Sequence, residues 1–314
     1  MKKWLGLLLL LLVALVGFNF LLPTSNKVTY AVALNVHPNA ALRCLTAPGL
    51  LQKWWPQPGE TVAAVPPQLL QLTYNEQTYQ VTPAAFDVVN IEIKDGSGTA
   101  PSIITVLPMQ HDSAFLTWTA ELPQSGVAGR FQQFFTARKL QKNMAAILHR
   151  LQQFVQSEHH VYGLAINQQQ VADTLLVVTK SETSTPPTVE TYYELFKKLR
   201  TYIAAKGVQE TNYPMLNILE VATNKYAITV AIPVNKVLPD NDGIAFKRMI
   251  PGGILFTEVR GGPGAIQEGF RQLNYYMVEH RLQQPGMAFQ SLITDRLAEP
   301  NTAKWVTKLY LPVQ

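Results

Sequence analysis

The alternation of apolar and polar residues divides the chain into parts with different periods. The first part is an almost uninterrupted apolar run at 4–22, in which Asn19 is the one strongly polar residue and which Lys2 and Lys3 precede. A helix of that length rises about 28 Å, close to the thickness of the hydrocarbon core of a bilayer. Positive charge before the run predicts a cytoplasmic N-terminus and an exported remainder. Residues 1–26 are therefore predicted to be a single N-terminal transmembrane anchor, with a cleaved signal peptide or a buried helix as alternatives.

The next part has the short period of strands. Residues 27–36 are rich in Val, Tyr and Ala, and several short apolar runs follow between 60 and 120, separated by turn signals such as Asp95-Gly96. Runs of this length between turn residues are typical of antiparallel strands. This part is predicted to be an antiparallel meander.

The period changes at Arg130. Apolar residues then recur mostly at steps of three and four, which indicates a long amphipathic helix over 130–155 with Lys139, Lys142 and Asn143 on its polar face. One helix folded onto a curved antiparallel sheet buries both apolar faces and can leave a cavity between them. The apolar positions are Phe131, Phe134, Phe135, Leu140, Met144, Ile147, Leu148, Leu151 and Val155.

Residues 28–158 resemble the SRPBCC, or START-like, helix-grip family of lipid and polyketide binders, which includes polyketide cyclase-like proteins. The resemblance rests on the order of the elements and on QKWWPQ at 52–57. It implies a helix-grip domain at 27–160. Trp55 would lie at the lip of the cavity or on a membrane surface, or would pack against the final helix.

The last part contains an internal repeat. Phe196, Leu199 and Tyr202 correspond to Phe270, Leu273 and Tyr276 at an offset of 74, whereas YAITVAIPV at 226–234 parallels WVTKLYLPV at 305–313 at an offset of 79. Each copy reads strand, helix, strand, strand, and the second has five extra residues in its hairpin. Two such halves are expected to pair around a pseudo-two-fold axis with a cleft between them.

Residues 172–314 resemble GyrI-like domains, the effector-binding modules also attached to bacterial transcription activators. The supporting segments are PGGILFTEVRGG at 251–262, MAFQSLITDR at 287–296 and KWVTKLYLPV at 304–313. The resemblance implies a cleft for drug-like, often cationic molecules with an acidic residue at its floor, and some relatives hydrolyse small strained rings with that residue. Here Gln290 takes the acidic position, and glutamine is neither a base nor an anion. Cation binding and hydrolysis are therefore not expected, whereas binding by shape and apolar contact is.

Seven residues are predicted to bind the ligand. Gln290 would orient it, and Glu258 would supply negative charge to the cleft unless it is a solvent-facing strand residue paired with Arg260. Trp305 and Tyr310 are five residues apart, so they should face opposite sides of the last strand. For each aromatic ring, core packing is the alternative. The set is Gln290, Glu258, Phe256, Trp305, Tyr310, Tyr213 and Trp55.

Composition narrows the chemistry. An apolar fraction of 47% and a charged fraction of 15% indicate a folded chain, and a net charge of +5 without a basic block gives no footprint of nucleic-acid binding. One cysteine and six scattered histidines offer no metal-ligand spacing. We predict no catalytic residue, no cofactor, no metal and no nucleic-acid partner.

The sequence thus predicts an α+β protein with an N-terminal membrane helix, a helix-grip sheet closed by a long C-terminal helix, and a duplicated βαββ GyrI-like domain at 170–314. The predicted function is membrane-anchored, extracytoplasmic (periplasmic) binding of a small apolar, aromatic or lipid-like molecule. Two alternatives remain: a hydrolase or cyclase with Glu258 as its base, and an envelope interaction protein without a ligand.

Overall fold

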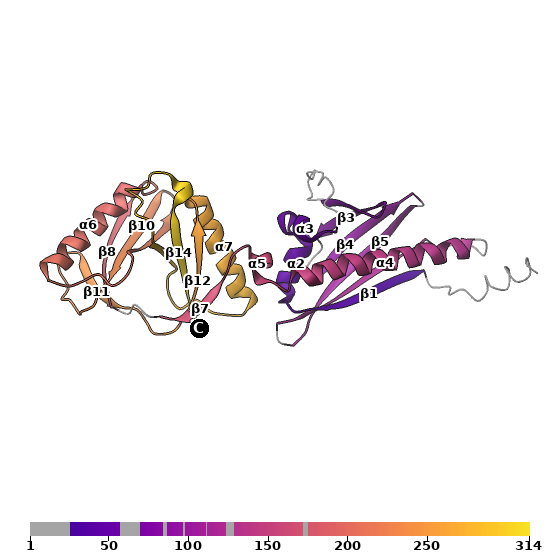
Figure 1. Ribbon diagram of the computed structural model, residues 1–314, viewed down its shortest axis with the longest axis horizontal. Helices are drawn as coiled ribbons and strands as arrows, with labels where there is room; N and C mark the ends of the chain where they lie inside the picture. The colour runs from indigo at the N-terminus through magenta and orange to yellow at the C-terminus, as the bar shows by residue number, and fades with distance from the viewer. Residues whose placement is uncertain are drawn as a thin grey trace, which may run out of the picture. The chain divides into compact units, whose positions relative to one another are not determined.

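The described residues of this computed structural model form two compact units, divided between Ser157 and Glu158 (Figure 1). Each unit contains one large antiparallel sheet, so the α+β class is confirmed. The structure describes residues 26–56, 70–83, 87–96, 98–110, 112–123, 129–171 and 175–314.

The membrane helix is a correction to the predicted fold class. The run at 4–22 lies outside the described residues, and within the described ranges no helix combines the length and apolarity that a bilayer span requires. The anchored, extracytoplasmic location and the membrane as a partner rested on that helix, and we withdraw them.

The first unit is a six-stranded antiparallel sheet in the order β1-β6-β5-β4-β3-β2. Strands β2 to β6 pair in sequence as successive hairpins, as the meander predicts, and β1 closes the other edge on β6. Its strands are β1 (Lys27–Leu34), β2 (Leu70–Tyr74), β3 (Gln77–Pro83), β4 (Val88–Asp95), β5 (Gly98–Pro108) and β6 (Ala114–Glu121), and its helices are α2 (Pro38–Thr46), α3 (Pro48–Trp54) and α4 (Arg130–Phe154).

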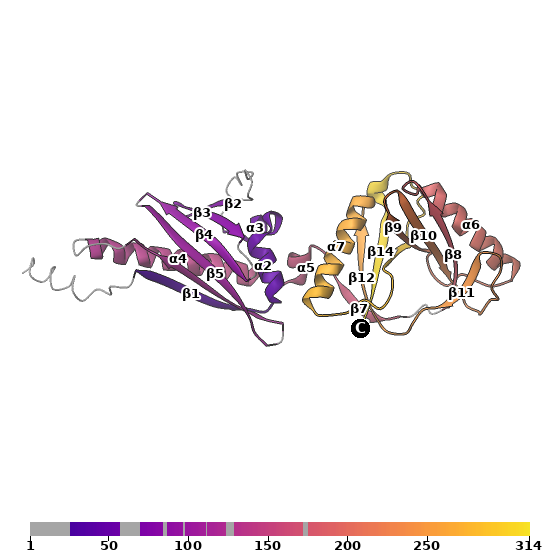
Figure 2. The ribbon, with the colours of Figure 1, turned by 180° about the vertical axis from the view of Figure 1, so that it is seen from behind.

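Helix α4 is the predicted amphipathic helix and runs along the sheet, which covers it in the view from behind (Figures 1 and 2). Its apolar stripe is buried from Leu140 onward, and the sheet side chains Tyr79 and Trp118 are fully buried in the same unit. The first turn differs from the prediction, because Phe131 and Phe135 are exposed and pack edge-to-face with each other rather than in the core.

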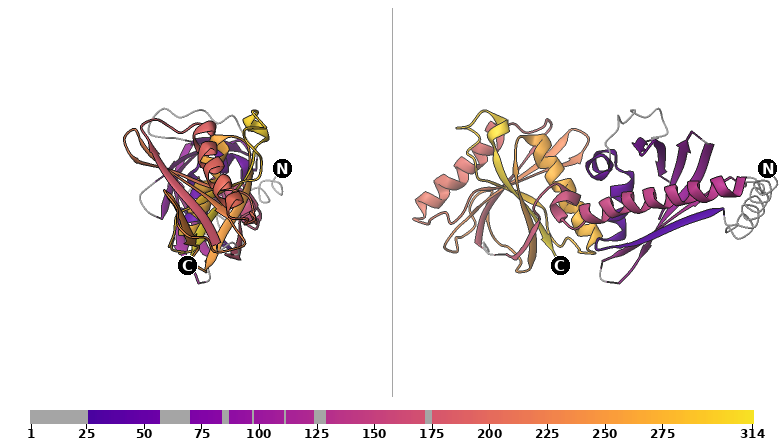
Figure 3. Two further views of the ribbon diagram at one scale, coloured as in Figure 1. Left: turned by 90° about the vertical axis from the view of Figure 1, so that its left-hand side faces the viewer. Right: turned by 45° about the vertical axis from the view of Figure 1, so that its right-hand side comes forward.

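The second unit is an eight-stranded antiparallel sheet in the order β11-β8-β10-β9-β13-β14-β12-β7. Helix α6 packs on β8 and β10, and α7 packs on β12 and β14 (Figure 3). The strands are β7 (Asn167–Gln170), β8 (Leu175–Thr183), β9 (Met215–Ala222), β10 (Lys225–Pro233), β11 (Ile244–Arg248), β12 (Gly253–Arg260), β13 (Phe289–Leu292) and β14 (Val306–Val313), and the helices are α5 (Glu158–Tyr162), α6 (Val189–Ala205), α7 (Pro263–Glu279) and the 3-10 turn η2 (Thr302–Lys304).

The strand order of the second unit shows the repeat directly. The central six strands read β8-β10-β9 and then β13-β14-β12, which is the same triplet in reverse. The leading strand of each copy is exchanged, since β7 pairs with β12 and β11 pairs with β8. Phe196 and Phe270, at equivalent positions on α6 and α7, both face the core of their own copy. The two copies are therefore related by a pseudo-two-fold axis.

The sheet face turned away from the two helices carries an apolar cluster at its centre. This cluster joins residues of both copies. Its buried members are Leu176, Val178, Met215, Ala231, Ile254 and Phe289.

Candidate functional site

Gln290 lies at the centre of the second unit, on the side of the sheet that carries the helices. It pairs with Leu309 on one side and with Leu216 on the other. Leu309 belongs to the core under α7 and Leu216 to the core under α6. Cross-strand partners share a face of the sheet, so Gln290 sits where the two cores meet.

Arg296 fills the space above Gln290. Its Nη2 donates to Gln290 Oε1 and to Thr307 Oγ1, both at 3.0 Å, and its Nη1 donates to the hydroxyl of Tyr192 at 3.3 Å. The guanidinium lies 4.5 Å from the ring of Trp305, within the range of a cation–π contact. The residue is only 6% exposed, so it acts as a buried bracket that ties α6 of the first copy to β13 and β14 of the second.

The five extra residues of the second copy lie in the loop that carries Arg296. They lengthen the connection between β13 and β14, which contains Arg296, whereas β9 and β10 are joined by a tight turn at Thr223 and Asn224. The polar partners of Arg296 have no polar counterparts in the opposite copy, because the positions equivalent to Gln290, Thr307 and Tyr192 hold only apolar side chains. Those equivalents are Leu216, Ile228 and Ile266.

The electrostatics of the bracket are unusual for a buried cation. Within the described ranges no carboxylate oxygen lies within 4.0 Å of Arg296, and its hydrogen-bond partners are all neutral. Burial raises the pKa of Tyr192, although the neighbouring guanidinium opposes that shift. Burial also raises the pKa of Tyr193 to about 12, and this hydroxyl accepts a hydrogen bond from the Arg296 backbone N–H at 2.7 Å. The centre can hold two copies together, but it presents no base.

The structure separates the aromatic residues of the predicted site. Trp305 lies with Arg296 and Gln290 on the helix side of the sheet. Tyr310 lies on the opposite face and stacks on Phe256, with ring centroids 5.9 Å apart, and on Phe289 at 5.0 Å. The prediction that Trp305 and Tyr310 face opposite sides is thus met.

The remaining predicted residues lie away from both groups. Glu258 is on β12 with its side chain 44% exposed, 4.0 Å from Arg260, as in the solvent-facing alternative. Tyr213 is exposed in the loop before β9. Trp55 belongs to the first unit, where it is buried and donates its indole N–H to the Thr73 carbonyl at 2.8 Å, so it is part of the core rather than a lip.

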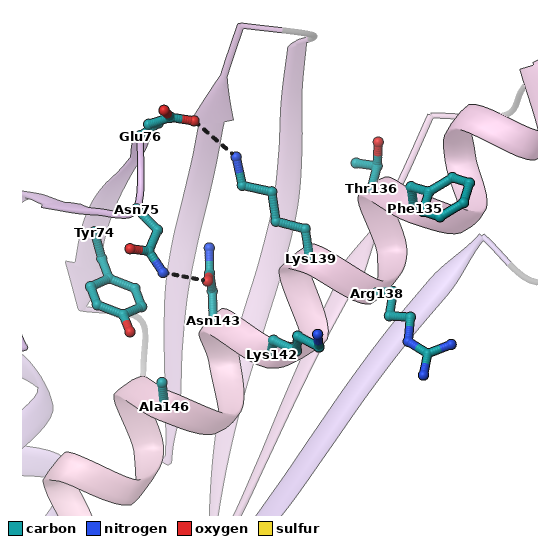
Figure 4. Close-up of a pocket in the computed structure, with 10 residues that line it drawn as sticks. All are labelled: Tyr74, Asn75, Glu76, Phe135, Thr136, Arg138, Lys139, Lys142, Asn143 and Ala146. Atoms are coloured by element: carbon teal, nitrogen blue, oxygen red, sulfur yellow. Dashed lines mark hydrogen bonds and ion pairs between the residues drawn. The ribbon is translucent and has the colours of Figure 1, made fainter.

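The first unit holds an open pocket of about 1150 Å³ between helix α4 and the turn that joins β2 to β3 (Figure 4). Asn75 and Glu76 form that turn with φ angles of 46° and 66°, the conformation that a two-residue hairpin loop requires. The pocket is lined by Tyr74, Asn75, Glu76, Phe135, Thr136, Arg138, Lys139, Lys142, Asn143 and Ala146.

Asn143 forms the polar floor of this pocket and is only 4% exposed. Its Oδ1 accepts a hydrogen bond from Asn75 Nδ2 at 3.1 Å, and its Nδ2 donates to Gln77 Oε1 at 2.7 Å. The hydroxyl of Tyr79 donates to the same Gln77 oxygen at 2.8 Å, and burial raises the pKa of Tyr79. These bonds fasten the β2–β3 turn to α4, so the floor is rigid and its polar groups are satisfied.

Sequence reasoning missed both of these features, although each left a signal. The extra residues in the second hairpin marked the segment that carries Arg296. The polar face of α4 was recognised, with Lys139, Lys142 and Asn143, but nothing in the period showed that the β2–β3 turn would lie over it. Within the residues that the structure describes, no three His, Cys, Asp or Glu side chains gather where they could hold a metal ion.

Comparison with known proteins gives likeness in structure only. No family model and no curated protein matches the chain. The C-terminal domain of EcmrR is similar at 13% identity over 48% of this chain and 98% of that one, with a TM-score of 0.41. SAV2435 bound to tetraphenylphosphonium gives 13% identity over 48% and 94%, with a TM-score of 0.34. The Aha1 dimer from Colwellia psychrerythraea gives 14% identity over 41% and 95%, with a TM-score of 0.32.

Because every one of these TM-scores is below 0.5 and every identity below 25%, the three neighbours carry no inference about the family, ligands or activity of this chain.

Proposed function

We propose that this chain binds a small amphipathic molecule non-covalently, in the pocket between α4 and the β2–β3 turn of the first unit. The observation that carries the proposal is the combination of an open volume of about 1150 Å³, an aromatic side chain at one end and a rigid buried amide at the floor. A ligand site needs an accessible concave surface on which apolar contact and placed polar groups are combined.

The pocket offers separate surfaces for the two parts of such a molecule. Phe135 is 54% exposed, so its ring can be covered by an apolar tail, and Ala146 lies further along the same helix. Asn143 and the basic side chains of α4 would face a polar head group. Covering apolar area contributes about 25 cal/mol per Å², which over one tail suffices for micromolar affinity.

The lining residues support binding rather than catalysis. A nucleophile or general base needs a partner within hydrogen-bond reach that activates it. Glu76, the carboxylate of the lining set, is 87% exposed at its side chain and is paired with Lys139. Thr136 has no histidine or carboxylate beside it in that set.

We assign the predicted site of the second unit a structural role instead. Gln290 and Trp305 hold Arg296, and their polar and aromatic surfaces are used in that contact. Arg296 occupies the position beside Gln290 at which the sequence predicted a ligand.

Titration calorimetry of the full chain with three dodecyl probes tests the proposal. The probes are laurate, monolaurin and dodecyltrimethylammonium, each kept below its critical micelle concentration. At least one probe should bind with micromolar affinity, and Phe135→Ala should weaken that binding about tenfold through lost apolar contact. Phe115→Ala is the matched control, since this ring is also exposed in the first unit but does not line the pocket. Binding of none of the probes, or equal loss in both variants, would contradict the proposal.

A further inference from the structure

We propose that the ligand of this pocket carries a negatively charged head group, a carboxylate, and that Lys142 of α4 recognises it. The inference rests on the proposed function and adds the chemical class of the ligand. It is carried by the charges of the pocket wall and by a carboxylate of the chain itself that already occupies part of that wall.

The wall is strongly asymmetric in charge. Three cationic side chains, Arg138, Lys139 and Lys142, line the pocket against one carboxylate, that of Glu76. They come from two successive turns of α4 and therefore stay together on one side of the helix.

The three cations are not equivalent. Lys139 points to the turn, where its Nζ lies 3.1 Å from Glu76 Oε2, and Arg138 points away from the turn (Figure 4). Lys142 follows Lys139 by three residues and is adjacent to the buried Asn143. In the described part of the chain no carboxylate lies within 4.0 Å of the Lys142 ammonium, which leaves it available to a head group.

The ion pair between Glu76 and Lys139 shows that the cationic side of the pocket binds a carboxylate. The Glu76 carboxylate crosses from the β2–β3 turn to α4, although the side chains of both partners are largely in water, with exposures of 87% for Glu76 and 50% for Lys139. Exposed pairs of this kind contribute little to stability, so an incoming carboxylate can replace Glu76 at small cost. The ligand would then span Lys139 and Lys142, with its tail along Phe135.

The three dodecyl probes, which differ in the charge of the head group, and three variants test this inference. Laurate should bind more tightly than monolaurin, and dodecyltrimethylammonium should bind more weakly than either. Lys142→Gln should weaken laurate about threefold to fivefold without changing monolaurin, whereas Glu76→Gln should strengthen laurate because a competing carboxylate is gone. Arg150→Gln, on the exposed side of the same helix, is the matched control for net charge and should change neither. Raising the salt concentration should weaken laurate only.

The outcomes separate the two proposals. If monolaurin binds as tightly as laurate, with Phe135→Ala still weakening both and Lys142→Gln weakening neither, the inferred charge class is wrong and the binding pocket stands. If Arg150→Gln weakens laurate as much as Lys142→Gln does, the effect comes from net charge and recognition by Lys142 is refuted. If no probe binds, the proposed function itself fails.

Discussion

Leu216 and Gln290 are paired in neighbouring antiparallel strands and also occupy the same position in the two copies of the second unit. Val230 opposite Leu216 corresponds to Leu309 opposite Gln290, so the pseudo-two-fold axis passes between Leu216 and Gln290 themselves. One side of the axis is apolar and the other is polar. This asymmetry gives Arg296 two hydrogen-bond acceptors in the second copy, Gln290 and Thr307, and the Tyr192 hydroxyl on α6 adds a third from the first copy.

Removing the central arginine should destabilise the second unit. Arg296→Ala leaves a cavity and deprives Gln290, Thr307 and Tyr192 of a buried donor, and we expect a loss of about 2–4 kcal/mol in the free energy of unfolding. Urea unfolding followed by circular dichroism measures it. Arg271→Ala is the control, because that exposed side chain on α7 pairs only with a neighbouring carboxylate and should change stability by less than about 0.5 kcal/mol. Equal losses of stability in the two variants would contradict the claim that Arg296 holds the two copies together.

The second unit should lose stability in alkali. Burial raises the pKa of Tyr193 to about 12 from an ordinary value of 10.0, so the folded state favours the protonated phenol. A raised folded pKa gives a contribution that is complete below about pH 10 and is lost as the pH rises toward 12. Unfolding free energies between pH 9 and 12 should fall less steeply for Tyr193→Phe than for the unchanged chain. Tyr213→Phe, at an exposed loop position, should leave the slope as it is.

Two glycines of α7 should respond oppositely to alanine. A Cβ on Gly269 would lie 2.5 Å from Leu309 Cδ1 and 2.8 Å from Val259 Cγ1, closer than atoms tolerate. Gly269→Ala should therefore destabilise by about 1–3 kcal/mol, because overpacking exceeds the gain in helix propensity. Gly264→Ala meets no atom within 4 Å and should be neutral or stabilising. Thermal unfolding of the two variants compares them, and a stable Gly269→Ala protein would show that α7 does not pack closely on its strands.

The amide floor should support the first unit. Asn143→Ala removes the bonds to Asn75 and Gln77, and leaving these buried groups unpaired should cost about 1–3 kcal/mol. Cys44 is a buried cysteine in the same unit, so its reaction with a thiol reagent in rising urea reports unfolding of this unit separately. Gln153→Ala, at a polar position further along α4, is the control and should react as the unchanged chain does. Equal reactivity of Asn143→Ala and the control would argue against a structural role for the floor.

Local patterns predicted the regular parts of the fold. The helical period placed a helix at 130–155, and the structure has α4 at Arg130–Phe154. The offset of 74 between Phe196 and Phe270 aligned two helices that begin and end at equivalent residues, Val189–Ala205 and Pro263–Glu279. These helix predictions succeed because the period of apolar residues reflects which face of an element is buried.

The features that depend on long-range contact were not predictable in the same way. Arg296 reaches α6 across about a hundred residues of sequence, and no period records such a contact. The exposure of Phe131 and Phe135 also differs from what their apolar character predicts. Both exceptions lie at the candidate sites, where local preference and the fold disagree.

The central claim is that the pocket between α4 and the β2–β3 turn binds an amphipathic carboxylate. A crystal structure of the full chain grown with laurate tests it most directly. We expect the carboxylate within hydrogen-bond distance of Lys142 Nζ and the alkyl tail against the ring of Phe135. Laurate bound in the second unit, or an empty pocket at a saturating laurate concentration, would contradict the claim.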